Sequence, residues 1–365
     1  MDSFKDFLEI QFSSIQTEAE LVEDRVIILE AGQKSGYSDE HAFVKVWNHA
    51  VKEGIVQDKE AMHKAIDDAQ SQDEENAKKS KPSKKGGDVE PPKHHELSFY
   101  HESNDVDKKD NKGFVGGKKD ENSKKGYYAE LHHAADTIHT VANHPDFKGA
   151  VEEKAQASVA GASHGKVTDR WARHGATNAT SKADLKIGDS HKISYKKSGG
   201  SQLMSAEPAE TKATYKHVIT HMRMAGKVNT TQAKKMFKHA DEAAKNMDAM
   251  RDVDPKDPKR DDKLDALKNE AQKHIDAIHN EHPEVTEHLH HEAASGNHKF
   301  GVGNEGSATH ILSSYNEKAQ SANLHHVDDY HKGKIKLAHP RVAKPKGKSS
   351  DGRSRPGNLK LDIRD

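Results

Sequence analysis

Residues 177–205 read TNATSKADLKIGDSHKISYKKSGGSQLMS and carry the strongest local pattern in the chain. Apolar and charged side chains alternate over residues 183–187, and the alternation resumes at Ile193 and Tyr195. A period of two is typical of a half-buried strand. Gly188-Asp189 lies between the two runs and suits a tight turn. The stretch therefore predicts a β-hairpin.

The two predicted strands bring an acid and a lysine together. Asp184 lies early on the first strand and Lys196 late on the second, so both side chains can reach one rim of a small sheet. A carboxylate can hold a cation, and a lysine can orient a water or face a phosphate. Taken singly, Asp184 also reads as an acid near a turn, and Lys196 with Lys197 as an edge-strand charge pair that opposes aggregation.

This arrangement resembles the PD-(D/E)XK nuclease superfamily, the core of many restriction enzymes, which has an acid on one strand and an acid-x-Lys triplet on the next. Asp184 matches the first acid, although Lys182-Ala183 precede it where the family has Pro. Ser194-Tyr195-Lys196 matches the triplet, with Ser in place of the usual acid. The resemblance covers roughly residues 126–225.

Two residues outside the hairpin extend the resemblance. Glu130, in a helix predicted over 127–142, matches a first-helix glutamate that often completes the metal site, and otherwise reads as a solvated helix residue. Gln202 lies where some members carry a helix glutamine. The resemblance implies an α+β fold in which a small mixed sheet is flanked by helices. It also implies Mg²⁺ or Mn²⁺ held by Glu130, Asp184 and the Tyr195 carbonyl, water activated by Lys196, and substrate supported by Lys182, Lys197 and Gln202.

Ser194 leaves open whether the protein is catalytic, because a hydroxyl is a poorer ligand than a carboxylate for a hard cation. The chain can be a one-metal enzyme, an enzyme whose acid has moved to Glu207 or Glu210, or a nuclease fold that only binds. The leading hypothesis is a metal-dependent nuclease that cleaves phosphodiester bonds in DNA. The alternatives are a non-catalytic phage structural or packaged protein that binds DNA or protein, and a scaffold built on residues 229–295.

The composition favours small cores joined by solvated segments, since hydrophobic residues make up 32%, aromatics 5% and charged residues 32%. We expect a helical interaction module at 1–70, a disordered charged linker at 71–125, and a nuclease-like core at 126–365. Within that core we expect a helical arm over 229–295 and basic C-terminal strands.

Periodicity and breakers predict further elements within this core. Residues 300–365 are expected to share one sheet with residues 126–225. The predicted helices are 149–174, 209–224, 230–251, 261–281 and 307–315, and the predicted strands lie near 333–342 and 358–364.

The formal net charge is −1, so a nucleic-acid surface requires local segregation of charge. Basic residues outnumber acidic ones from Lys332 to Arg364, which suits a phosphate backbone, of DNA in preference to RNA, or simply a solvated basic tail. Arg170, Trp171 and Arg173 can meet a phosphate and a base, or form a helix end whose Trp packs.

The absence of cysteine excludes disulfides and thiolate zinc sites, while 28 histidines suit a metal store or a pH sensor. The histidines are spread along the whole chain and form no repeated ligand set, which favours ordinary surface positions. No apolar run approaches the roughly 18 residues of a membrane helix, and no secretory leader is expected. The opening residues 1–8 resemble the start of some proteins of large tailed bacteriophages, which implies host cytoplasm or virion and a phage structural partner for residues 1–70.

Overall fold

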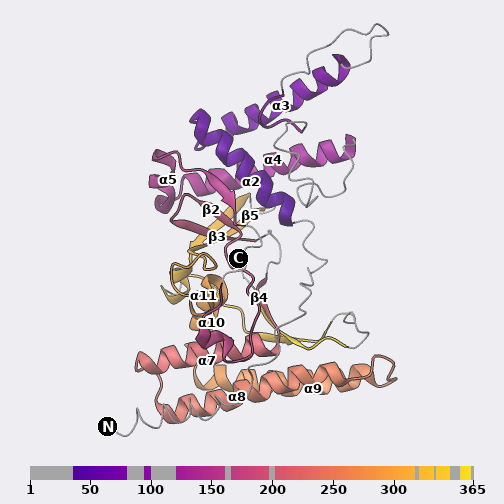
Figure 1. The fold of residues 1–365 in the computed structure, drawn as a ribbon, viewed down its shortest axis with the longest axis vertical. Helices are drawn as coiled ribbons and strands as arrows, with labels where there is room; N and C mark the ends of the chain where they lie inside the picture. Colours follow the sequence, from indigo (N-terminus) through magenta and orange to yellow (C-terminus); the bar gives the residue numbers. More distant parts are fainter. Residues whose placement is uncertain are drawn as a thin grey trace. The chain divides into compact units, whose positions relative to one another are not determined.

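The computed structural model describes residues 36–79, 94–99, 121–160, 166–196, 202–316, 320–332, 334–345 and 354–362. All of them fall in one compact unit, residues 35–365. The architecture is α+β, with one mixed sheet and one antiparallel sheet, each covered by helices (Figure 1). Expectations for residues 1–35, 80–93 and 100–120 lie outside the described residues.

The predicted hairpin is confirmed and lies in the larger sheet. Strands β2 (Leu185–Ile187) and β3 (His191–Lys196) pair antiparallel, with Leu185 opposite Ile193. Gly188 occupies the turn with φ +57°, a left-handed conformation that a residue without Cβ adopts at no steric cost. The sheet order is β1-β2-β3-β5-β6, in which β1 is Ala157–Val159, β5 is His310–Asn316 and β6 is Ser321–His326.

The sheet is mixed because β3 and β5 run parallel while the other neighbouring pairs are antiparallel. Helices α2 (Gly36–Glu53), α3 (Lys59–Lys79) and α4 (Glu121–Ala142) accompany this sheet. Phe43 and Trp47 of α2 share one apolar core with Leu131 of α4 and with Leu185 of the hairpin. The Trp47 indole also donates a hydrogen bond to the Ala155 carbonyl, at 2.9 Å.

Two expectations for the N-terminal half change accordingly. Residues 36–70 share a core with the hairpin, although they were expected in a separate module. Helix α3 continues to Lys79, and Leu97 and Phe99 are buried, so the predicted linker boundary at residue 70 is wrong.

The second sheet is antiparallel, with the order β4-β8-β7. Strand β4 is Gln202–Ala206, β7 is Arg341–Ala343 and β8 is Asn358–Asp362. The strand predicted at 358–364 is therefore present as β8, and it pairs with β4 and β7. Among the described C-terminal strands, β5 and β6 join the hairpin sheet. The expected single sheet is thus correct in part.

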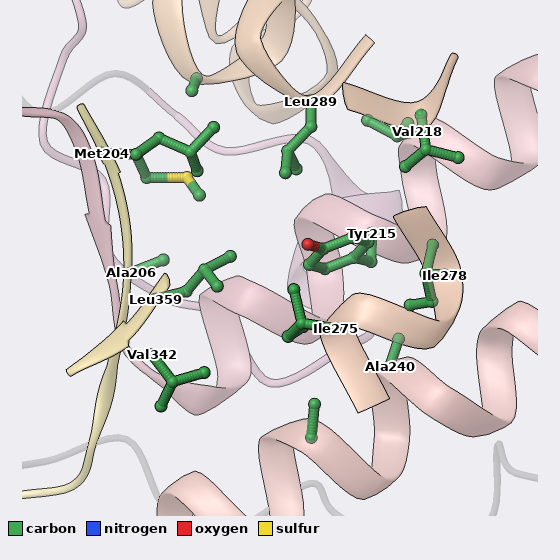
Figure 2. Packing of buried hydrophobic residues seen from close by; sticks show 14 of the residues in the cluster. Met204, Ala206, Tyr215, Val218, Ala240, Ile275, Ile278, Leu289, Val342 and Leu359 are labelled. Atoms are coloured by element: carbon green, nitrogen blue, oxygen red, sulfur yellow. The ribbon is translucent and has the colours of Figure 1, made fainter. Parts of the chain in front are cut away.

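Helices α7 (Pro208–Met224), α8 (Thr230–Ala249), α9 (Arg260–Glu281) and α10 (Val285–Ser295) pack with the second sheet. Figure 1 shows α7, α8 and α9 side by side. Figure 2 shows side chains from these helices and from β4, β7 and β8 converging around Tyr215. The helices predicted at 209–224, 230–251 and 261–281 are confirmed, but they belong to this core and do not form a projecting arm.

The helix predicted over 149–174 is wrong. That stretch contains α5 (Lys148–Glu152), strand β1 and α6 (Asp169–Ala172). Asn48 of α2 explains the strand: its side chain accepts from the Ala157 N–H at 2.6 Å and donates to the Ala157 carbonyl at 3.0 Å. This tertiary contact satisfies both backbone groups of an extended residue and overrides the helix propensity of the alanines.

The helix predicted over 307–315 is also wrong, because that stretch forms β5. Residues 310–314 are all buried, so the strand lacks the alternation that identifies half-buried strands. The remaining short elements are η2 (Pro145–Phe147), η3 (Met250–Asp252), α11 (Asn297–Phe300) and η4 (Val327–Lys332).

Candidate functional site

The hairpin brings Asp184 and Lys196 into direct contact, as the sequence predicted. Asp184 Oδ2 accepts from the Tyr195 N–H at 2.8 Å and from Lys196 Nζ at 3.1 Å. The Ser194 hydroxyl lies 3.4 Å from the same oxygen. The pair remains accessible, since the Asp184 and Lys196 side chains are 27% and 20% exposed. The Tyr195 carbonyl, expected beside a metal, here accepts from Lys196 Nζ at 3.2 Å.

Ser194 is buried and directed at Asp184. Its hydroxyl is therefore directed at the Asp184 carboxylate and not at the open rim. The structure makes Ser194 a neighbour of the acid on the adjacent strand.

A third ionisable residue at this rim is Glu40, in the first turns of α2. Burial first, and the negative charge of Asp184 next, raise the pKa of Glu40 to about 8, while Lys196 acts in the opposite direction. Glu40 therefore lies within electrostatic range of both hairpin residues. Sequence reasoning missed it because residues 1–70 were expected to form a separate helical module. The available signal was an acid one turn before the apolar face that begins at Phe43.

Glu130 is half-buried on α4, next to the fully buried Leu131. Its role as a metal ligand stays a prediction. Lys197 lies outside the described residues. Gln202 is on strand β4, opposite Asp362, so the expectation that it lies on a helix is wrong.

A group of buried charges lies behind the hairpin, around Lys182. Lys299 Nζ of α11 contacts Glu210 Oε1 of α7 at 2.7 Å, and both side chains are at least nine-tenths buried. Glu292 of α10 accepts from the backbone N–H groups of His298 and Lys299, at 2.8 and 3.0 Å. These four residues, Lys182, Glu210, Glu292 and Lys299, form what we call the charged support.

The charged support shifts the pKa of its members. Burial, and then the positive charge of Lys299, lower the pKa of Lys182 to about 8. Lys196 acts on Lys182 in the same direction, which links the support to the hairpin. Burial raises the pKa of Glu292 to about 7, against its two backbone hydrogen bonds and the nearby lysines.

Gly296 leaves room for Lys182. A Cβ at Gly296 would lie 2.7 Å from Lys182 Cγ and 3.1 Å from the Phe300 ring, and the residue has φ +67°. Both the close approach and the left-handed backbone explain why glycine occupies this position.

The two acids considered as migrated ligands have other partners. Glu207 is exposed and lies 3.6 Å from Arg251. Glu210 is buried against Lys299. These partners hold both acids away from Asp184. The pKa of Glu40, in contrast, is shifted by the charges of Asp184 and Lys196.

Two carboxylates, Glu40 and Asp184, are available for a divalent cation. In the described ranges no group of three or more His, Asp or Glu side chains is disposed to hold a metal ion. Mg²⁺ is commonly held by one or two carboxylates together with substrate phosphates. Burial first and the Asp184 charge second raise the pKa of Glu40, and a cation at this rim would favour the ionised form of Glu40. Carboxylate oxygens are ligands of the kind that Mg²⁺ and Mn²⁺ take.

The other expected nucleic-acid contacts are reduced by packing and ion pairing. Trp171 is buried against the His217 ring, so the alternative of a packed Trp is confirmed, while Arg170 and Arg173 are exposed. In the basic C-terminal region, several cations already have acidic partners: Lys332 and Lys334 with Asp329, Arg341 with Asp362, and Lys344 with Asp265.

Among the helices of the described part of the chain, none has the length and apolar character needed to cross a membrane. Comparison with known proteins found no matching family model, no matching curated protein and no matching solved structure.

Proposed function

We propose that the protein is a metal-dependent nuclease that cleaves phosphodiester bonds in DNA, with a restriction-endonuclease-like core. One observation carries the proposal: Asp184, directly before β2, contacts Lys196 at the end of β3 at an accessible rim, within electrostatic range of the half-buried Glu40. A carboxyl with a strongly shifted pKa, such as Glu40, beside charged partners is typical of a functional site. The family resemblance supplies the reaction class.

In this proposal Glu40 and Asp184 hold Mg²⁺ or Mn²⁺. The bound metal ion stabilises negative charge on the phosphate. Glu40 takes the place that the sequence suggested for Glu130, because its pKa responds to Asp184 and Lys196.

Lys196 positions the water or the phosphate. Two of its three ammonium N–H groups are used by Asp184 and by the Tyr195 carbonyl, which fixes the direction of the third. Beside the Asp184 carboxylate, Lys196 serves as a hydrogen-bond donor to the nucleophile or to a phosphate oxygen. Lys182 lies within electrostatic range of Lys196 and links the charged support to it.

The alternative is a non-catalytic protein, for example a structural or packaged protein of a phage, that uses the same rim to bind DNA or protein. Ser194 favours this alternative, since it stands where the family has a carboxylate and is buried.

Cleavage assays on plasmid and single-stranded DNA, with Mg²⁺ and then Mn²⁺, test the proposal. We expect Asp184→Asn and Lys196→Met to abolish cleavage. Asp189→Asn and Lys186→Met carry the same exchanges on the same hairpin and should retain it, because Asp189 is exposed in the turn and Lys186 pairs with Glu305. Cleavage that survives in both site variants would refute the proposed site. DNA retardation without cleavage by the folded parent would favour the non-catalytic alternative.

A further inference from the structure

Seven histidines from five parts of the fold form a continuous line of neighbouring rings. Successive ring centroids lie 5.3, 6.3, 5.2, 5.8, 4.6 and 4.4 Å apart. The line starts in the turn after α6, passes through α7, α11 and α10, and ends between α10 and η4. In this order its members, which we call the histidine array, are His174, His217, His298, His221, His288, His331 and His291.

The hydrogen bonds of the array suit neutral rings. Lys227 Nζ lies 3.0 Å from His288 Nε2, and an ammonium can only donate, so that nitrogen must be unprotonated. His217 Nδ1 donates to the Ala213 carbonyl at 2.9 Å. His291 Nε2 donates to Asp328 Oδ1 at 3.2 Å, and Asp328 is shared with His326 at 3.5 Å.

The acidic side chains around the array are too few to offset the charge that seven protonated rings would carry. The acids that act on it are Asp328 of η4, Glu287 of α10 and Asp241 of α8. Asp241 is already paired with Lys212 and Lys216, at 3.2 and 2.9 Å. The cations that face the array from α6, α7 and the turn after α7 are Arg170, Lys212, Lys216 and Lys227.

The array links α10 and α11 to α7. These helices also contribute to the core around Tyr215 and to the charged support. Leu289 and Ala293 of α10 are buried in the core around Tyr215. Glu292 of α10 and Lys299 of α11 belong to the charged support. Separation of α10 and α11 from α7 would therefore expose apolar surface and unpair buried charges.

We propose that the histidine array is an acid-operated latch, in which protonation of neighbouring rings drives α10 and α11 away from α7 and η4. At neutral pH the rings pack as uncharged aromatic groups. In mild acid the added charges lie within a few ångströms of one another and of Lys227, and they repel. The inference is independent of the proposed nuclease activity.

The direction of the pH dependence follows from burial. Burial first, and neighbouring histidines and lysines next, lower the pKa of His288 to about 3 and of His291 and His298 to about 4. In an open state these rings bind protons near pH 6.5. The closed state therefore loses stability as pH falls from about 6.5 toward 4, and regains it above pH 6.5.

Hydrogen exchange on the full chain tests the latch. Between pH 7.5 and 5.5, each ring that is neutral when closed and titrates near 6.5 when open raises the opening equilibrium about tenfold. His288→Gln/His291→Gln keeps an acceptor for Lys227 and a donor for Asp328 but removes two titrating rings. We expect the acid-induced rise in opening of α10, after correction for intrinsic exchange rates, to shrink by about a hundredfold in this variant.

His239→Gln/His274→Gln is the matched control, because these rings also contact each other, 5.2 Å apart, but lie on α8 and α9 outside the array. It should leave the acid response of α10 unchanged. An α10 response that is the same in the array variant as in the parent would overturn the proposal. So would NMR titration of the parent in which His288 and His291 protonate near pH 6.5 while α10 stays closed; this second measurement needs no variant.

Discussion

Removal of the Lys299 ammonium should leave a buried carboxylate without its partner. Lys299→Met keeps an unbranched chain of similar length, so the main change is loss of the 2.7 Å contact with Glu210 and of the ammonium 5.2 Å from the Phe300 ring. At an effective dielectric constant of about 20, two charges at this separation attract by about 6 kcal/mol. Part of that energy offsets the desolvation of the lysine, and we expect a net loss of about 3–5 kcal/mol in the free energy of unfolding.

Urea denaturation at pH 7.5, followed by circular dichroism, measures this loss. Lys212→Met is the control on α7: it makes the same exchange at a side chain that is 37% exposed and pairs with Asp241, so about 1 kcal/mol or less is expected. Lys299→Met/Glu210→Gln should recover most of the loss, since no buried charge is then unpaired. A loss in Lys299→Met no greater than in Lys212→Met, or a double variant no more stable than the single one, would refute the reasoning.

Three further substitutions test other parts of the fold. Glu40→Gln should remove a pH-dependent loss of stability. Because the pKa of Glu40 is raised in the folded state, the parent loses up to about 1.4 kcal/mol in the free energy of unfolding for each pH unit between pH 4.5 and 8, and the variant does not. The urea midpoints of parent and variant should therefore differ more at pH 8 than at pH 5. Gly296→Ala should lower the free energy of unfolding by about 1–3 kcal/mol, because the new Cβ meets Lys182 and the positive φ is strained for alanine. Gly226→Ala, with φ +72° and open space around it, should lower it only through the backbone strain. Equal losses in thermal unfolding would argue against the contact with Lys182. Trp47→Phe should destabilise by about 1–3 kcal/mol through the unpaired Ala155 carbonyl, and an unchanged urea midpoint would contradict this.

The sequence was sufficient where the pattern is local. The hairpin alternates with a period of two, and α7, α8 and α9 carry helical stripes between clear breakers, so these elements were predicted. The contact of Asp184 with Lys196 followed directly from the hairpin register, because adjacent strands bring their ends together.

The errors arose where distant residues decide the structure. Strand β1 exists because Asn48 satisfies both backbone groups of Ala157. Strand β5 is buried on both faces and therefore shows no alternation. Glu40 reaches the candidate site only because α2 packs beside the hairpin, and no spacing rule connects it to Asp184.

The histidine array is the extreme case of such long-range assembly. Its members come from residues 174 to 331, and in the sequence they read as scattered polar positions. The packing of α10 and α11 against α7 and η4, and of the turn after α6 against α7, brings the rings within 4.4–6.3 Å of their neighbours.

The strand order of the second sheet has a consequence for synthesis on the ribosome. Strand β8 is central, between β4 and β7, although it is the strand furthest along the described chain. Because chains emerge from their N-terminal end, β4 waits without a partner while α7 to α10, the rest of the hairpin sheet and β7 are made. Its Leu203 and Met204 are buried in a core that is complete only when Leu359 and Leu361 of β8 join it. The second sheet therefore cannot be completed until β8 has been made, and β4 presents an unpaired strand edge until then.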